Sequence, residues 1–114
     1  MANTFTKSTK SSLSTADVTS SSATNVVTAG GTATLIILSV LVSNKTGSSA
    51  NGNIYLLSNT GDAAFLIKNA PIPAGSSLEM ISGSKVIMTA NDVLRASSDT
   101  SSALDITVSY LQQT

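Results

Sequence analysis

The stretch TATLIILSVLVSN, residues 32–44, decides which fold this chain can adopt. It is rich in β-branched and large aliphatic residues, which favour extended structure. With strict alternation, one face would carry Ile36, Leu38, Val40 and Val42, and the other Leu35, Ile37 and Leu41. A strand that is apolar on both faces is covered on both faces. We therefore expect it either at the centre of a sandwich or half-covered by another subunit.

Turn residues divide the rest of the chain into further short apolar runs. The segment NTGD at residues 59–62 separates NIYLLS from AAFLIK. Asn, Gly and Asp tolerate the left-handed backbone that hairpin turns need, so this segment predicts a hairpin. Tyr55 and Phe65 are then expected to face each other across it.

Two prolines and two glycines mark the region that follows. Pro71 and Pro73 remove two amide donors, which indicates a segment at a sheet edge or in a connection. The runs SLEMIS and KVIM are expected to form a second hairpin around Gly83, with Glu79 pointing outward.

The last apolar run, LDITVSYL, alternates between apolar and polar residues. Its apolar positions are Leu104, Ile106, Val108 and Tyr110. This alternation predicts a strand with one buried and one solvated face. In all, the chain holds about seven or eight strands at a spacing of about 8 to 12 residues, and no segment has a helical period. We predict an all-β fold, an antiparallel β-sandwich that is jelly-roll-like in arrangement.

The first 23 residues differ from the rest in composition. They are dominated by Ser and Thr, and their only substantial apolar side chains are Phe5, Leu13 and Val18. So little burial cannot offset the loss of chain entropy. We therefore expect an extended N-terminal arm over residues 1–23, ordered by a neighbour if at all, and a β-sandwich domain over residues 24–114.

Charge is scarce in this chain. Charged residues make up 11%, and six basic residues balance six acidic ones, whereas an ordinary domain has about 25% charged residues. Either part of the surface is covered by other protein, or the Ser- and Thr-rich surface is soluble by itself. The longest apolar run, residues 35–42, is far shorter than the roughly 20 residues of a membrane helix, so we expect no membrane span.

The residues that usually carry chemistry are missing. The chain has no Cys and no His, which removes thiol nucleophiles, the commonest general base and the commonest metal ligand. A Ser-Lys pair formed by Ser82 or Ser84 with Lys85 has the composition of an ordinary turn. The acidic residues considered as catalytic or metal-binding are Asp62, Glu79, Asp92, Asp99 and Asp105. Their spacing is that of solvated turn residues, so we expect no enzyme activity, no cofactor and no metal.

Nucleic-acid binding is not expected either. It would require a basic stripe with stacking aromatic residues. The six basic residues are scattered along the chain, and the aromatic residues are isolated.

Three segments together resemble a known group of proteins. LIILSVLVSNKTGSSANGNIYLL, IPAGSSLEMISGSKVIMTANDVLRASSDT and ALDITVSYL follow one another over roughly residues 24–111. This order resembles small structural proteins of tailed bacteriophage virions. The resemblance implies a noncatalytic particle component: a capsid decoration (cement) protein, or a part of the neck, tail or fibres.

These observations lead to one main hypothesis and one alternative. The chain would be a capsid decoration protein of a virion assembled in the bacterial cytoplasm, a homo-oligomer with a trimer favoured, bound to the major capsid protein or another virion protein. The alternative is a neck, tail or fibre component that binds a receptor or a carbohydrate. The expected interface residues are Phe5, Leu13, Val18, Leu35, Ile37 and Leu41.

Overall fold

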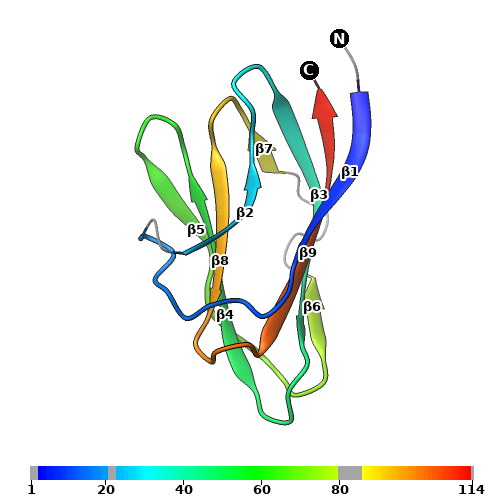
Figure 1. Cartoon of the computed structure of the whole chain (residues 1–114), viewed down its shortest axis with the longest axis vertical. Helices are drawn as coiled ribbons and strands as arrows, with labels where there is room; N and C mark the ends of the chain where they lie inside the picture. Colours follow the sequence, from blue (N-terminus) through cyan, green and yellow to red (C-terminus); the bar gives the residue numbers. More distant parts are fainter. Residues whose placement is uncertain (1–2, 21–22, 80–85, 114) are drawn as a thin grey trace.

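The computed structural model describes residues 3–20, 23–79 and 86–113, and in these ranges it contains nine β-strands and no helix. The strands are β1 (Asn3–Lys10), β2 (Thr24–Thr28), β3 (Thr34–Asn44), β4 (Ala50–Leu57), β5 (Ala63–Ile72), β6 (Ser77–Glu79), β7 (Val86–Met88), β8 (Val93–Ser98) and β9 (Leu104–Gln113). They form two antiparallel sheets that lie face to face as two layers (Figure 1). The all-β, antiparallel prediction is confirmed.

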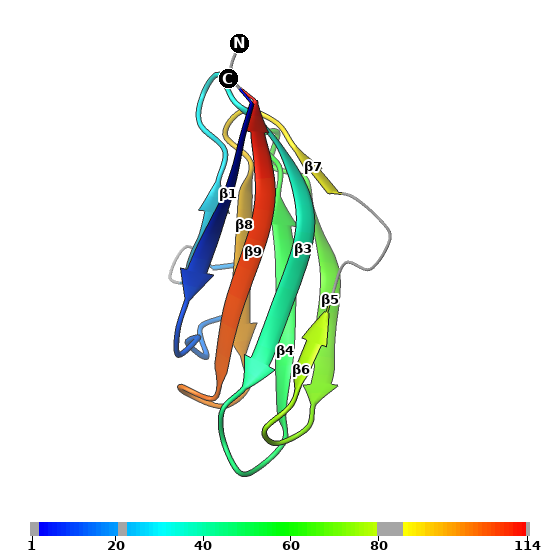
Figure 2. The same cartoon turned by 90° about the vertical axis from the view of Figure 1, so that its right-hand side faces the viewer.

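Strands pair from the ends of the chain inward. The five-stranded sheet has the order β1-β9-β3-β6, with β7 also paired to β3, and the four-stranded sheet has the order β2-β8-β4-β5. First therefore pairs with last, second with next to last, and β4 with β5 in the innermost hairpin. Figure 2 looks onto the five-stranded sheet, with β1, β9, β3 and β6 side by side.

The second predicted hairpin is wrong. Strands β6 and β7 both pair with β3 and run in line along it, β6 opposite Leu41–Ser43 and β7 opposite Leu35–Ile37. Gly83 itself lies outside the described residues. A hairpin of such short strands is marginal by itself, whereas the long edge of β3 offers both segments a backbone ladder and an apolar face.

A β-bulge in β3 corrects the predicted faces of this strand. The register with β9 shifts between Ile37 and Ser39. Because a bulge inserts one extra residue, the side chains beyond it change face. Leu35 and Ile37 therefore point inward together with Val40 and Val42, and all four are buried. The opposite face of β3 is only half-covered within the chain, and the expectation that another subunit covers it stays a prediction.

The core between the sheets is aliphatic. Its largest fully buried side chains are Leu13, Leu35, Ile37, Ile54, Ile72, Met88, Leu94, Leu104 and Ile106. The described part of the chain buries no aromatic ring completely, and Tyr110 packs against the core from its margin. Leu104, Ile106 and Val108 are buried as the alternation of the last run predicted.

The N-terminal residues do not form the expected arm. Strand β1 pairs with β9 along its whole length, from Asn3 opposite Gln113 to Lys10 opposite Ile106. Residues 11–20, termed the connecting segment, then cross to the other sheet. Two of their side chains are buried, Leu13 in the core between the sheets and Val18 beside the outer face of the four-stranded sheet. The segment has too few apolar groups to fold alone. It is ordered because β9 offers a free edge, the gap between the sheets takes the Leu13 side chain, and Val18 is buried against the outer side of the four-stranded sheet.

The hairpin of β4 and β5 is confirmed. The amide of Ser58 donates to the carbonyl of Asp62 at 2.8 Å, and Gly61 has a φ of 93°, in the left-handed region. Tyr55 lies opposite Phe65, with ring centroids 5.1 Å apart in an edge-to-face arrangement. The prediction that Pro71 lies at a sheet edge or in a connection is also confirmed, because this residue lies in β5, the edge strand of the four-stranded sheet.

A buried carboxylate ties two turns together at one end of the molecule. Asp92, 6% exposed, accepts hydrogen bonds from the amides of Thr89 and Asn59, both at 2.9 Å, and from the Thr89 hydroxyl at 3.2 Å. Burial raises the pKa of the Asp92 carboxyl, but these hydrogen bonds outweigh burial and hold the pKa below its ordinary value.

Asp92→Asn should lower the free energy of unfolding at pH 7 by about 1–3 kcal/mol, because a charge-assisted acceptor of three hydrogen bonds becomes neutral. Urea denaturation measures the difference. Asp62→Asn is the matched control, since Asp62 is an exposed turn residue whose side chain makes no hydrogen bond in the described chain. Equal effects of the two substitutions would contradict the assigned role of Asp92.

The stabilisation by Asp92 should also depend on pH. Its folded-state pKa lies below the unfolded value of about 3.9, so the contribution is complete above about pH 5 and is lost as the pH falls through the folded-state pKa. The stability difference between wild type and Asp92→Asn should therefore shrink below about pH 4, as urea titrations over this range would show. A constant difference would argue against a charge effect.

Leu13→Ala should cost about 2–4 kcal/mol, because it removes a buried side chain from between the sheets. Phe5→Ala, on the exposed strand β1, should cost less than about 1 kcal/mol. Chemical denaturation of both variants makes the comparison. A neutral Leu13→Ala would restore the idea of a detached arm.

Candidate functional site

An apolar row crosses the outer face of the five-stranded sheet. Phe5 in β1 pairs with Leu111 in β9, Leu111 with Ile36 in β3, and Ile36 with Ile87 in β7. Directly paired residues project to the same face, and here the face is outward because Leu35 and Ile37 point inward. Phe5 is 76% and Ile87 51% exposed, while the two central residues are half-buried. These four residues are termed the apolar row.

A shallow hollow adjoins the row at β1. It has a volume of about 430 Å³, and Phe5, Lys7 and Leu38 are among the residues that line it. Leu41, further along β3, adds another exposed aliphatic side chain to this face. The outer face of the five-stranded sheet therefore combines exposed apolar groups with few charges, and such surfaces mark interaction sites.

The expected interface residues fall into two groups. Phe5 and Leu41 are exposed on the outer face. Leu13, Val18, Leu35 and Ile37 are buried within the chain, so they are core residues of the folded protein. Ile36, Leu111 and Ile87 of the apolar row were not among the expected interface residues. The alternation of VIM could have indicated that Ile87 points outward. No residue type in the sequence marks the bulge in β3, which sets the outward direction of Ile36.

A second, polar hollow lies on the outer face of the four-stranded sheet. Its volume is about 300 Å³. The connecting segment forms one wall with Thr15 and Asp17, and strand β5 forms the opposite side with Phe65 and Lys68. Asp99, just after β8, completes the rim. No site was expected here, because residues this far apart in the chain carry no shared motif.

Hydrogen bonds hold the floor of the polar hollow. The side chain of Asn53 donates to the Ser97 hydroxyl at 3.2 Å and accepts from the amide of Asn69 at 2.8 Å. Arg95 donates to the carbonyl of Val18 at 3.3 Å and so fixes the connecting segment to β8. The hollow is thus built into the folded chain.

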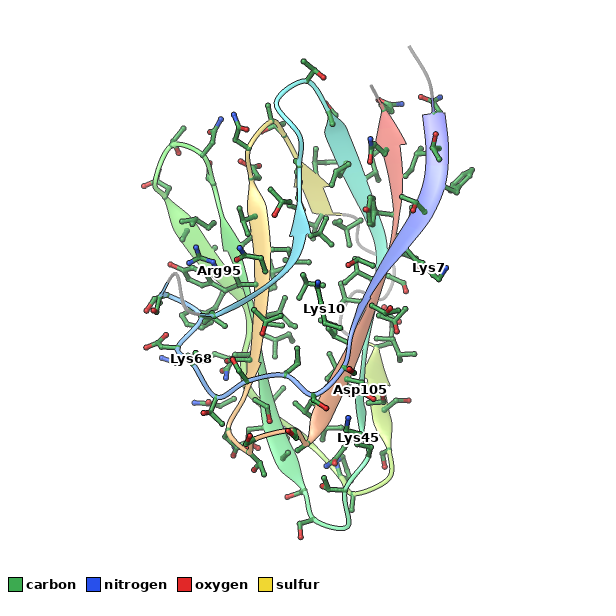
Figure 3. The ribbon with its side chains drawn as sticks, in the orientation of Figure 1. Lys7, Lys10, Lys45, Lys68, Arg95 and Asp105 are labelled. Carbon is green, nitrogen blue, oxygen red and sulfur yellow. The ribbon has the colours of Figure 1, made fainter. Side chains whose placement is uncertain are left out.

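Opposite charges line the polar hollow. The pKa of Asp17 is lowered by hydrogen bonds from the amide and hydroxyl of Thr19, with a smaller contribution from the positive charge of Lys68. The Lys68 ammonium lies 5.1 Å from the centroid of the Phe65 ring, a cation–π contact. Figure 3 shows Lys68 beside the connecting segment.

Other candidate carboxylates have structural partners. Asp105 forms an ion pair with Lys45 at 2.9 Å and accepts from the amide of Ser12 at 2.8 Å, and these contacts lower its pKa. Glu79 is exposed as predicted, and it accepts from the Val40 amide at the bulge, at 3.1 Å. Within the described ranges, no group of three or more acidic, His or Cys residues could hold a metal ion.

The remaining predictions on chemistry concern dispersed or undescribed residues. Ser82, Ser84 and Lys85 lie outside the described residues. The other described basic residues, Lys7, Lys10, Lys45, Lys68 and Arg95, lie apart from one another on strands of both sheets and in the loop after β3 (Figure 3). None of the described segments forms a helix with the length and apolarity needed to cross a bilayer.

Comparison of the chain with protein-family models, with curated proteins and with solved structures finds no match.

Proposed function

We propose that this protein is a non-enzymatic structural component of a bacteriophage virion, and that it binds the major capsid protein as a decoration protein. The observation that carries this proposal is the apolar row, whose two ends are largely exposed across four neighbouring strands. Binding of another protein over the row would remove these apolar side chains from water, which is favourable because of the hydrophobic effect. The sequence resemblance to small proteins of tailed-phage virions supports the same function.

The order of the strands supports a jelly-roll-like fold. If β6 and β7 count as one interrupted edge strand, the chain has eight strands in two sheets of four, paired from the ends inward. A long antiparallel hairpin rolled up in this way is a jelly roll, an architecture found in viral capsid and lectin domains. This agreement adds to the case for a particle protein, although fold alone does not assign function.

We further propose that the protein acts as a homo-oligomer, with a trimer as the form that a threefold position between capsomers would select. The scarcity of charge favours close packing of copies. Many weak contacts made by repeated copies then add up on one particle. The proposed location is the virion, and the separate positions of the described basic residues favour protein over nucleic acid as the partner.

A second candidate function is a neck, tail or fibre component that binds a receptor or carbohydrate. The polar hollow on the four-stranded sheet favours it, since it combines an aromatic ring with charged and amide side chains. Copy number separates the two candidates, because a decoration protein occurs in far more copies per particle than a tail component.

The double variant Phe5→Ser, Ile87→Thr should bind phage heads that lack the protein at least roughly tenfold more weakly than wild type. Both ends of the apolar row are made polar, and burial of one such side chain is worth about 1.5–3 kcal/mol. Co-sedimentation with the heads measures the binding. Phe65→Ser, on the opposite sheet, is the control and should bind like wild type. Undiminished binding by the double variant would refute the role of the row.

A further inference from the structure

We propose that the polar hollow of the four-stranded sheet is a saccharide site that takes a single neutral sugar residue. The site lies on the sheet opposite the apolar row, so it is a second binding surface in addition to the one assigned to particle attachment. Both surfaces can be occupied at once. A chain attached to a particle through the row would present the hollow outward.

The rim of the hollow offers acceptors with spare capacity. Both hydrogen bonds that Asp17 receives from Thr19 end on Oδ1. Asp99 also accepts two hydrogen bonds on its Oδ1 atom, one from the amide of Asn51 and one from the hydroxyl of Thr100. The Oδ2 atom of each carboxylate is thus an acceptor without a partner in the described chain. Carboxylate oxygens accept strong hydrogen bonds from hydroxyl groups.

The opposite side of the hollow offers donors. The ammonium of Lys68 forms no ion pair within the described ranges, where the ion pair present joins Lys45 to Asp105. The side-chain amide of Asn69 makes no hydrogen bond in the same part of the chain. Since a sugar hydroxyl both donates and accepts, a mixture of free donors and acceptors suits a polyhydroxylated ligand.

An aromatic ring provides the apolar part of the site. Phe65 is 39% exposed, and the edge-to-face contact with Tyr55 fixes its orientation. Sugars have apolar C–H faces that pack on aromatic rings. Phe65 can therefore bind the sugar through the part of its ring that the Lys68 ammonium leaves uncovered, while the polar groups bind the sugar hydroxyls. A ring, two carboxylates and two donors in one hollow fit this ligand class better than a purely apolar or purely ionic ligand.

The charge and the volume of the polar hollow further restrict the class of sugar that it can bind. Of the charged groups that line the hollow, two are carboxylates and one is an ammonium, whereas the nearby Arg95 guanidinium is bound to Asn25 and to the Val18 carbonyl. The lining therefore carries a net negative charge that disfavours acidic sugars. Its volume of about 300 Å³ lies at the lower end of the range of about 300–1,000 Å³ for small-molecule sites. This is room for one sugar residue. Its floor is held by the Asn53 hydrogen bonds and its wall by Arg95, so the site is largely preformed.

The test is an NMR titration of the full-length chain with glucose, galactose, mannose and N-acetylglucosamine, each added separately. At least one sugar should give saturable shifts of the Lys68, Asn69 and Asp99 amides. Amides on the five-stranded sheet, such as that of Thr107, should not move. Glucuronate should bind more weakly than glucose, because its carboxylate meets Asp17 and Asp99.

Matched variants locate the site. Phe65→Ala should weaken binding of the responding sugar by roughly tenfold or more, whereas Phe5→Ala, which removes the other phenylalanine from the opposite sheet, should leave it unchanged. Phe65→Leu serves where Phe65→Ala fails to fold, since it keeps an apolar side chain but loses the ring. Both Phe65 variants should bind phage heads like wild type, so the saccharide site and the capsid interface can fail separately.

Three results would overturn the saccharide site. The first is the absence of saturable shifts with all four sugars. This result would also overturn the site if lysine amide, added as a cationic probe, gave saturable shifts, because the hollow would then bind cations. The second is sugar binding that survives in both Phe65 variants. The third is binding of glucuronate as tight as that of glucose, which would contradict the charge argument.

Discussion

The bulge in β3 is the constraint on which the two-sheet structure depends. Without it, strict alternation would send either Leu35 and Ile37 or Val40 and Val42 to the outer face, and β3 would lose two of these four side chains from the core. The insertion lets one strand present its apolar residues to the core on both sides of the bulge. The Glu79 carboxylate stabilises it by accepting the Val40 amide. The same geometry keeps Ile36 on the outer face, where the apolar row needs it.

The N-terminal residues contribute to both candidate surfaces. Strand β1 brings Phe5 to the apolar row, and the connecting segment brings Asp17 to the rim of the polar hollow. Between them, Leu13 anchors the segment in the core, and its amide donates to the Leu104 carbonyl at 2.8 Å. A part of the chain with the composition of a flexible tail is therefore the physical link between two surfaces on opposite sheets.

Local signals predicted the local structure well. The NTGD turn specifies its hairpin and so the pairing of Tyr55 with Phe65, and strict alternation specifies the inner face of β9. Partners distant in the sequence could not be predicted in this way. No residue type marks the bulge. Short runs such as SLE and VIM are compatible with a hairpin or with pairing to the edge of β3. Residues 3–10 form a strand only because β9 offers them a free edge. The polar hollow could not be predicted for a related reason, because each of its aspartates and asparagines resembles an ordinary turn residue in the sequence.

Inward pairing of the strands has a consequence for biosynthesis. Both β1 and β3 pair with β9, which leaves the ribosome after every other strand of the described chain. Translation adds about 5–20 residues per second, so the apolar stretch of β3 stays without its main partner for several seconds on every nascent chain. The five-stranded sheet can be completed only after β9 has left the ribosome. Until then, chaperones or neighbouring nascent chains compete for a strand that the finished molecule hides on one side.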